Sequence, residues 1–227
     1  MINDIKKIIQ LSKYGFKAKT QMIFMVVFII VGIVWEFVFQ GMHWIGAFFI
    51  ILAPAYFAQL LYGMGMSSMV GASPYKKRLQ ILYPVLANCI LEFAAMTIIV
   101  LIKAFEMRLY PENRTGLMSV LLVTSLFCIA LNIYSAVVYK YYALAIVLLL
   151  LPVMTMSFVF NVDSFYNFEG SLLADISDRV GFGGLVSFCY FSIVIGTAVQ
   201  YFSSVAIYKK PLSEYAMGMA MRKALKG

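Results

Sequence analysis

Six long apolar stretches dominate the sequence, and each has close to the length that a helix needs to cross a lipid bilayer. About 20 mostly apolar residues suffice, because lipid offers the backbone no hydrogen-bond partners other than those within the helix. The stretches cover residues 21–39, 45–66, 83–102, 117–138, 142–160 and 184–207. They occupy most of the 227 residues, so the sequence predicts an all-α, polytopic membrane protein with six transmembrane helices.

The composition agrees with this fold class. Hydrophobic residues make up 63% of the chain and charged residues only 12%, whereas a soluble domain has about 25% charged residues. The three cysteines are an odd number, lack metal-ligand spacing and lie inside apolar stretches, so we interpret them as packing residues. They are Cys89, Cys128 and Cys189.

The basic residues are unevenly distributed between the connections. Fourteen of the 18 Lys and Arg lie in the first 20 residues, between stretches two and three, between stretches four and five, or after stretch six. The positive-inside rule places these segments, and hence both termini, in the cytoplasm. Outside we expect Lys103, Arg108, Arg114 and Arg179, with Glu106, Glu112, Asp163, Glu169, Asp175 and Asp178. Because topology explains the net charge of +8, nucleic-acid binding is not needed.

Several segments do not span the membrane in this interpretation. Residues 1–20 have isoleucines near helical spacing between lysines, which favours an amphipathic interfacial helix before the transmembrane domain of residues 21–208. Residues 209–227 form a basic cytoplasmic tail. Residues 161–183 mix apolar and acidic side chains, which indicates short re-entrant or surface helices on the outer side. A plain basic flank that only sets topology is the alternative for residues 1–20.

The cytoplasmic segment 73–80 begins like a helix. Ser73 can cap it and Pro74 suits its first position. Such a helix would place Tyr75 and Leu79 on one side and expose its basic residues, Lys76, Lys77 and Arg78. A turn that only sets topology is the alternative, but the helix start favours a docking role.

Glu92 lies at the middle of the third stretch, where a charge costs about 2.5–3.5 kcal/mol. We therefore expect it to face the bundle interior, with Asn88 one turn earlier on the same face. Candidate partners on other helices are Gln59, Asn132 and Gln200. Two interpretations stay open: a residue on a translocation path, or a polar clamp that fixes helix packing. Glu36 is expected to reach water from the outer end of the first stretch, and the lone His43 to be an interfacial surface residue.

Catalytic motifs are missing from the sequence. It contains no G-x-x-x-x-G-K-[ST] phosphate-binding loop, no G-x-S-x-G and no H-E-x-x-H. With one histidine and few buried carboxylates, we expect no enzyme activity, no metal site and no cofactor in this chain.

The order of these segments resembles the permease subunit of ABC-2 type ATP-binding-cassette exporters. The resemblance covers the whole chain and rests on layout: a basic amphipathic start, six stretches, a short basic helix after the second and a long apolar loop after the fifth. The sequence Leu11-Ser12-Lys13-Tyr14-Gly15-Phe16 before the first stretch is also similar to small bacterial members.

That resemblance implies the remaining expectations. Residues 73–80 would be the helix that couples to a partner ATPase, which would hold ATP and Mg, and two permease copies would pair. The cargo would be an amphipathic or hydrophobic substrate, such as a peptide of the toxin, phenol-soluble-modulin or bacteriocin type. The chain would lie in a bacterial cell membrane. Alternatives are a proton-coupled transporter or small channel using Glu92, a non-transporting membrane scaffold, or the substrate-binding component of a vitamin importer.

Overall fold

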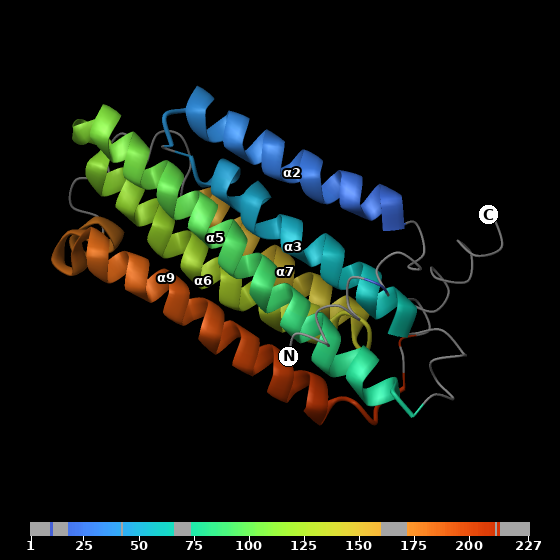
Figure 1. Cartoon of the computed structure of the whole chain (residues 1–227). Coiled ribbons are helices and arrows are strands. Elements are labelled where there is room, and N and C mark those ends of the chain that lie inside the picture. The colour runs from blue at the N-terminus through green and yellow to red at the C-terminus, as the bar shows by residue number, and fades with distance from the viewer. Residues whose placement is uncertain are drawn as a thin grey trace.

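Long apolar helices lie side by side in one elongated bundle in the computed structural model of the chain (Figure 1). The structure describes residues 10, 18–41, 43–65, 74–159, 172–211 and 213, and these contain no β-strand. The main helices are α2 (Ala18–Val38), α3 (Trp44–Gly65), α5 (Tyr83–Leu109), α6 (Arg114–Val137), α7 (Tyr142–Val159) and α9 (Leu172–Ala206). A π-helical turn, η1 (Arg78–Leu82), precedes α5, and a 3-10 turn, η2 (Pro111–Asn113), precedes α6.

Among the described residues, five helices are long and apolar enough to cross a membrane: α2, α3, α5, α6 and α9. The sixth apolar helix, α7, is shorter. The chain is therefore a multi-pass membrane protein of the all-α class. The predicted stretches match the observed helices closely, because long apolar runs need no other signal to become helices in lipid.

Helix α7 is needed to connect the two ends of the bundle. At one end the Thr115 hydroxyl at the start of α6 donates to Asp178 near the start of α9 (3.2 Å). At the other end Lys140, just after α6, donates to the carbonyl of Lys210, just after α9 (2.6 Å). Helices α6 and α9 thus run in the same direction, and the chain between them returns along the bundle through α7 (Figure 1).

Burial ranks the helices from the centre to the edge of the bundle. In the apolar stretch of α6, 78% of the residues are buried, against 11% in α2. The core around α6 includes Ile50 of α3, Met96 of α5, Phe127 of α6 and Ile193 of α9. Helix α2 packs mainly on α3 and turns most of its apolar side chains outward.

Two helices extend beyond the predicted stretches. Helix α5 continues to Leu109, so Lys103 and Glu106 are helical and buried, and the expectation that they lie outside, beyond the third apolar stretch, was wrong. Helix α9 begins at Leu172 and contains non-helical backbone at Gly181 (φ 68°, ψ 167°), which separates residues 172–180 from the spanning part. A short helix therefore lies in the part of segment 161–183 that the structure describes.

The two predicted terminal segments fall mostly outside the described residues. Of the amphipathic segment 1–20, residues 18–20 belong to α2 and residue 10 is helical. Of the tail, the structure describes residues 209–211 and 213, and the Ser213 amide donates to the Tyr139 carbonyl (3.0 Å).

Candidate functional site

A buried polar cluster, called here the central cluster, lies inside the bundle around Glu92 of α5. Asn88 donates to one carboxyl oxygen of Glu92 (2.8 Å), and Asn132 of α6 donates to both (3.0 and 2.8 Å). The Cys128 thiol lies 3.4 Å from the second oxygen. All four residues are buried. Each of these partners is a donor, so both oxygens of the carboxyl group are held and helix α5 is tied to α6.

The central cluster also reaches α9 and α3. The Asn88 amide nitrogen lies 3.4 Å from the side-chain oxygen of Gln200, and Gln200 donates to the Tyr62 hydroxyl of α3 (3.3 Å). Gly196 makes the approach of α9 possible, because a Cβ there would lie 2.8 Å from the Asn132 amide nitrogen. The cluster therefore joins four helices through hydrogen bonds between side chains.

The sequence predicted most of this cluster. Asn88, Asn132 and Gln200 all contribute hydrogen bonds, as the helical spacing and polarity suggested. Gln59 does not: among the described contacts its backbone carbonyl accepts from Tyr139 (3.4 Å), and its side chain makes no hydrogen bond to the cluster. Donors on both oxygens of Glu92 favour the clamp interpretation over a free residue on a path.

A small cavity of about 30 Å³ lies between the central cluster and the end of the bundle where α6 turns into α7. Such a volume has room for about one or two water molecules. Its lining is partly polar and includes Tyr62, Gln80, Tyr139, Lys140 and Ser204. Tyr62 belongs to both the cavity and the central cluster, so the polar groups continue from the middle of the bundle towards this end.

A second buried cluster, called here the triad, lies at the opposite end. The Lys103 ammonium of α5 forms a close ion pair with Glu36 of α2 and lies 3.3 Å from Glu106, one turn further along α5. It also donates to the carbonyl of Gly41 (2.6 Å). These three side chains are at most 1% exposed. The expectation that Glu36 reaches water was wrong, because Lys103 holds it inside the bundle.

Two glycines shape the backbone around the triad. Gly41 adopts φ +68°, which favours glycine, and a Cβ there would lie 1.9 Å from a carboxyl oxygen of Glu106. A Cβ on Gly46 of α3 would lie 2.7 Å from the Glu36 side chain. The turn between α2 and α3 is therefore closely fitted to the two carboxyl groups.

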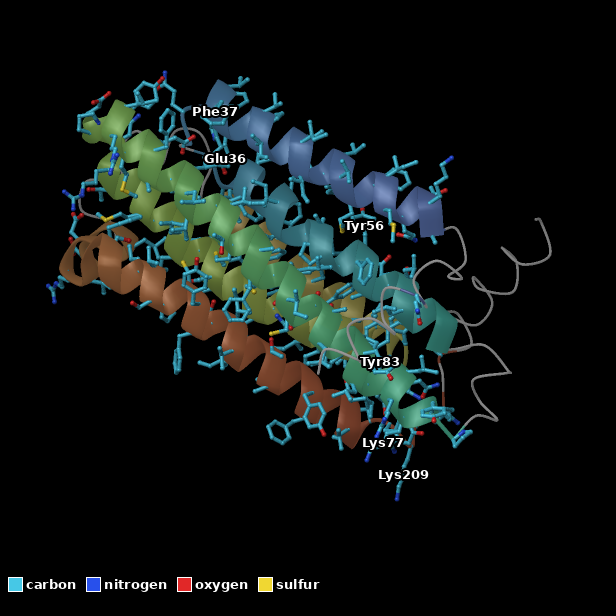
Figure 2. All side chains as sticks on the ribbon, in the orientation of Figure 1. Glu36, Phe37, Tyr56, Lys77, Tyr83 and Lys209 are labelled. Atoms are coloured by element: carbon cyan, nitrogen blue, oxygen red, sulfur yellow. The ribbon has the colours of Figure 1, made fainter. Side chains whose placement is uncertain are left out.

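A third feature is the basic segment, residues 74–79, which precedes α5. Tyr75, Lys77 and Arg78 are exposed, while Leu79 is half-buried against Leu60 and Leu61 of α3 and their neighbours. Lys77 and Lys209 lie at the same end of the bundle, and Glu36 lies at the other (Figure 2).

The basic segment does not form the separate short helix that the sequence predicted. Lys76 and Lys77 are helical, and η1 then passes without a break into α5. Pro84 explains the irregular turn, since it lacks an amide proton and its ring displaces the carbonyl one turn earlier. The predicted capping residue Ser73 lies outside the described residues, and Pro74 forms a turn with Tyr75.

Lys140 fixes the adjoining connection between α6 and α7. Its ammonium donates to the carbonyls of Lys210 (2.6 Å) and Tyr208 (3.4 Å) beyond α9. Partial burial, and then the nearby charge of Lys76, lower the pKa of Lys140. The basic segment, the α6–α7 turn and the chain after α9 thus meet at one end, called here the basic end.

Sequence reasoning missed the triad. Lys103 and Glu106 lie beyond the third apolar stretch, so they were assigned to the outer side and not to the buried part of a helix. The available signal was their spacing, since residues three apart share a helix face, together with the isolated Glu36 at the same end. Scans against protein-family models, curated proteins and solved structures find no match to this chain.

Proposed function

We propose that the chain is the transmembrane permease subunit of an ABC-2 type ATP-binding-cassette exporter in a bacterial cell membrane. It would move an amphipathic or hydrophobic cargo, a peptide in particular, out of the cell. A separate ATPase subunit would bind and hydrolyse ATP with Mg, and this chain would catalyse no reaction. The proposal includes six spans, cytoplasmic termini and a pair of permease copies.

The basic segment carries this proposal. It exposes Tyr75, Lys77 and Arg78 at the basic end, where a soluble partner could contact them. It is also continuous through η1 with α5, the helix that holds Glu92 and Lys103. A displacement of the segment would therefore move α5 as a rigid body and would act on both buried clusters, as a transport cycle driven by a partner requires.

The distribution of charge supports the proposed orientation. The basic segment, Lys140 and Lys209 lie at one end of the bundle (Figure 2), and the positive-inside rule assigns such an end to the cytoplasm. An ATPase that uses cytoplasmic ATP would meet the basic segment there. The return of the chain through α7 supports a sixth crossing.

Packing supports a cargo path at the surface of one chain, between two copies. Helix α6 is buried through most of its length, so the middle of the described bundle is filled with side chains. A wider hollow of about 540 Å³ lies on the outer face of α6 and α9. Its lining is mostly apolar and includes Leu122, Val180, Leu185, Phe188 and Phe191. Such a surface suits the apolar side of an amphipathic cargo.

Copurification tests the proposal. A tagged chain expressed at native level should copurify from its own membranes with an ATP-binding-cassette ATPase subunit, identified by mass spectrometry. The double variant Lys77→Glu with Arg78→Glu should reduce the recovered ATPase at least about tenfold, as a loss of about 1.4 kcal/mol would. The control variant Lys209→Glu with Lys210→Glu makes the same charge change at the same end and should recover it normally. Transport in cells that lack every such ATPase would contradict the proposal.

Gradient-driven transport through Glu92 is the competing function, because Glu92 is fully buried at the middle of a spanning helix. Glu92→Gln removes the charge and nearly preserves the shape. Loss of transport in this variant, with ATPase recovery unchanged and transport insensitive to ATP depletion, would favour the competitor.

A further inference from the structure

The triad has a net negative charge when all three of its side chains are ionised. If all three groups are ionised, Glu36 and Glu106 contribute two negative charges and Lys103 one positive charge. All three side chains are at most 1% exposed, so water does not solvate the excess negative charge. Burying an uncompensated charge costs several kcal/mol, and proteins relieve that cost by pairing or by protonation.

Nothing else in the described surroundings supplies a compensating positive charge. Helix α3 faces the triad with Gly46, and α6 with Leu117, which lies against the same turn. The other titratable group near the triad is His43 in the α2–α3 turn. Its own burial, and then the charge of Lys103, lower the pKa of His43, so its imidazole is neutral at neutral pH.

The hydrogen bonds of the two carboxyl groups also indicate that one of them is neutral. Among the described residues, one oxygen of Glu106 is buried without a hydrogen-bond partner. The corresponding oxygen of Glu36 makes no hydrogen bond of good geometry and has only the Ala47 backbone amide nearby. The other oxygen of each group lies against the Lys103 ammonium. A buried anionic oxygen without a donor costs more than the same atom on a neutral acid, so one carboxylate paired with Lys103 and one neutral acid fit the geometry better than two carboxylates.

We propose that the triad is a proton-binding site, in which Glu36 and Glu106 share one exchangeable proton beside the Lys103 ammonium. The bound proton makes the triad neutral and allows the α2–α3 turn to close on α5. Opening of that turn would solvate both carboxylates and release the proton. The site does not depend on the proposed transport role, because it follows from the charges and burial of this chain alone.

Infrared spectroscopy of the purified chain in lipid nanodiscs at neutral pH tests the site by counting protonated carboxyl groups. The wild type should show one protonated acid from the triad. Glu36→Gln and Glu106→Gln should each remove it, since one carboxylate then remains to pair with Lys103. Lys103→Met should instead raise the count to two. Any contribution from Glu92 cancels in the difference spectra between wild type and variants.

Lys103→Met is not essential to the test if it does not fold. The two glutamine variants should fold, because glutamine resembles a protonated glutamate in shape, and they test the proposal by themselves. An unchanged protonated-acid band in both of them would overturn the proposal. The proposal would also be overturned if the wild type shows no triad-dependent band and sodium or potassium stabilises the protein. A metal cation would then supply the compensating charge.

Thermal unfolding provides a second readout. The folded triad binds a proton that an unfolded glutamate releases at neutral pH, so the wild type should lose stability as the pH rises. The shift of Tm with pH should be smaller in Glu106→Gln than in the wild type. Equal shifts in wild type and Glu106→Gln would contradict a bound proton in the triad.

Discussion

The central cluster and the triad both place polar side chains inside an apolar bundle, but they are stabilised differently. Around Glu92 the partners are amide and thiol groups from α5 and α6, with Gln200 and Tyr62 adding α9 and α3. In the triad the partner is a cation that reaches from α5 to the edge helix α2. Many neutral donors can hold one carboxyl group among well-buried helices, whereas one cation must serve two carboxyl groups at the bundle edge.

This contrast assigns different roles to the clusters. The central cluster fixes the relative position of helices that already share a large apolar core. The triad joins α5 to a hairpin whose outer helix otherwise packs mainly on α3. We therefore expect disruption of the triad to loosen the α2–α3 turn from α5, and disruption of the central cluster to loosen packing without affecting that turn.

The largest effect is expected for Lys103→Met. It leaves two carboxyl groups buried without a cation, and breaking a buried ion pair from one side costs about 3–5 kcal/mol. Thermal unfolding of the purified chain measures the loss, and limited proteolysis near the α2–α3 turn should become faster. Glu106→Gln is the matched control, because it keeps the Lys103–Glu36 pair and should be much milder. Equal losses of stability in the two variants would contradict the view that the triad depends mainly on the Lys103 cation.

Asn132→Leu should have the next largest effect. It removes the donor to both oxygens of Glu92 and leaves the second oxygen with only the weakly donating Cys128 thiol, at a cost of about 1–3 kcal/mol. Unfolding experiments should show this loss, while cleavage at the α2–α3 turn stays at the wild-type rate. Faster cleavage there would show that the two clusters are one cooperative unit.

The smallest effect concerns the close approach of α9 to α6. Gly196→Ala places a methyl group 2.8 Å from the Asn132 amide, and such overpacking should cost about 1 kcal/mol. Gly183→Ala on the same helix is the control, since a Cβ there meets nothing within 4 Å. Equal stability of the two variants would show that the Gly196 contact does not tighten the central cluster.

Sequence reasoning recovered the helices well, because apolar length alone determines a membrane span. It also placed Asn88 and Asn132 with Glu92, since few polar side chains occur in those spans. The triad could not be found in the same way, because the pairing of Glu36 with Lys103 depends on how the α2–α3 hairpin packs on α5. The irregular turn η1 was missed because segment 73–80 was expected to be a separate short helix, whereas the chain continues from it through η1 into α5.

We propose above that the basic segment contacts a partner ATPase. A photo-crosslinking amino acid at position 77, in the native membrane, tests it directly, with position 209 at the same end as the control. The account predicts a cross-link from position 77 to an ATP-binding-cassette ATPase, with a much weaker one from position 209. A fully active chain whose position 77 cross-links to no ATPase would contradict it.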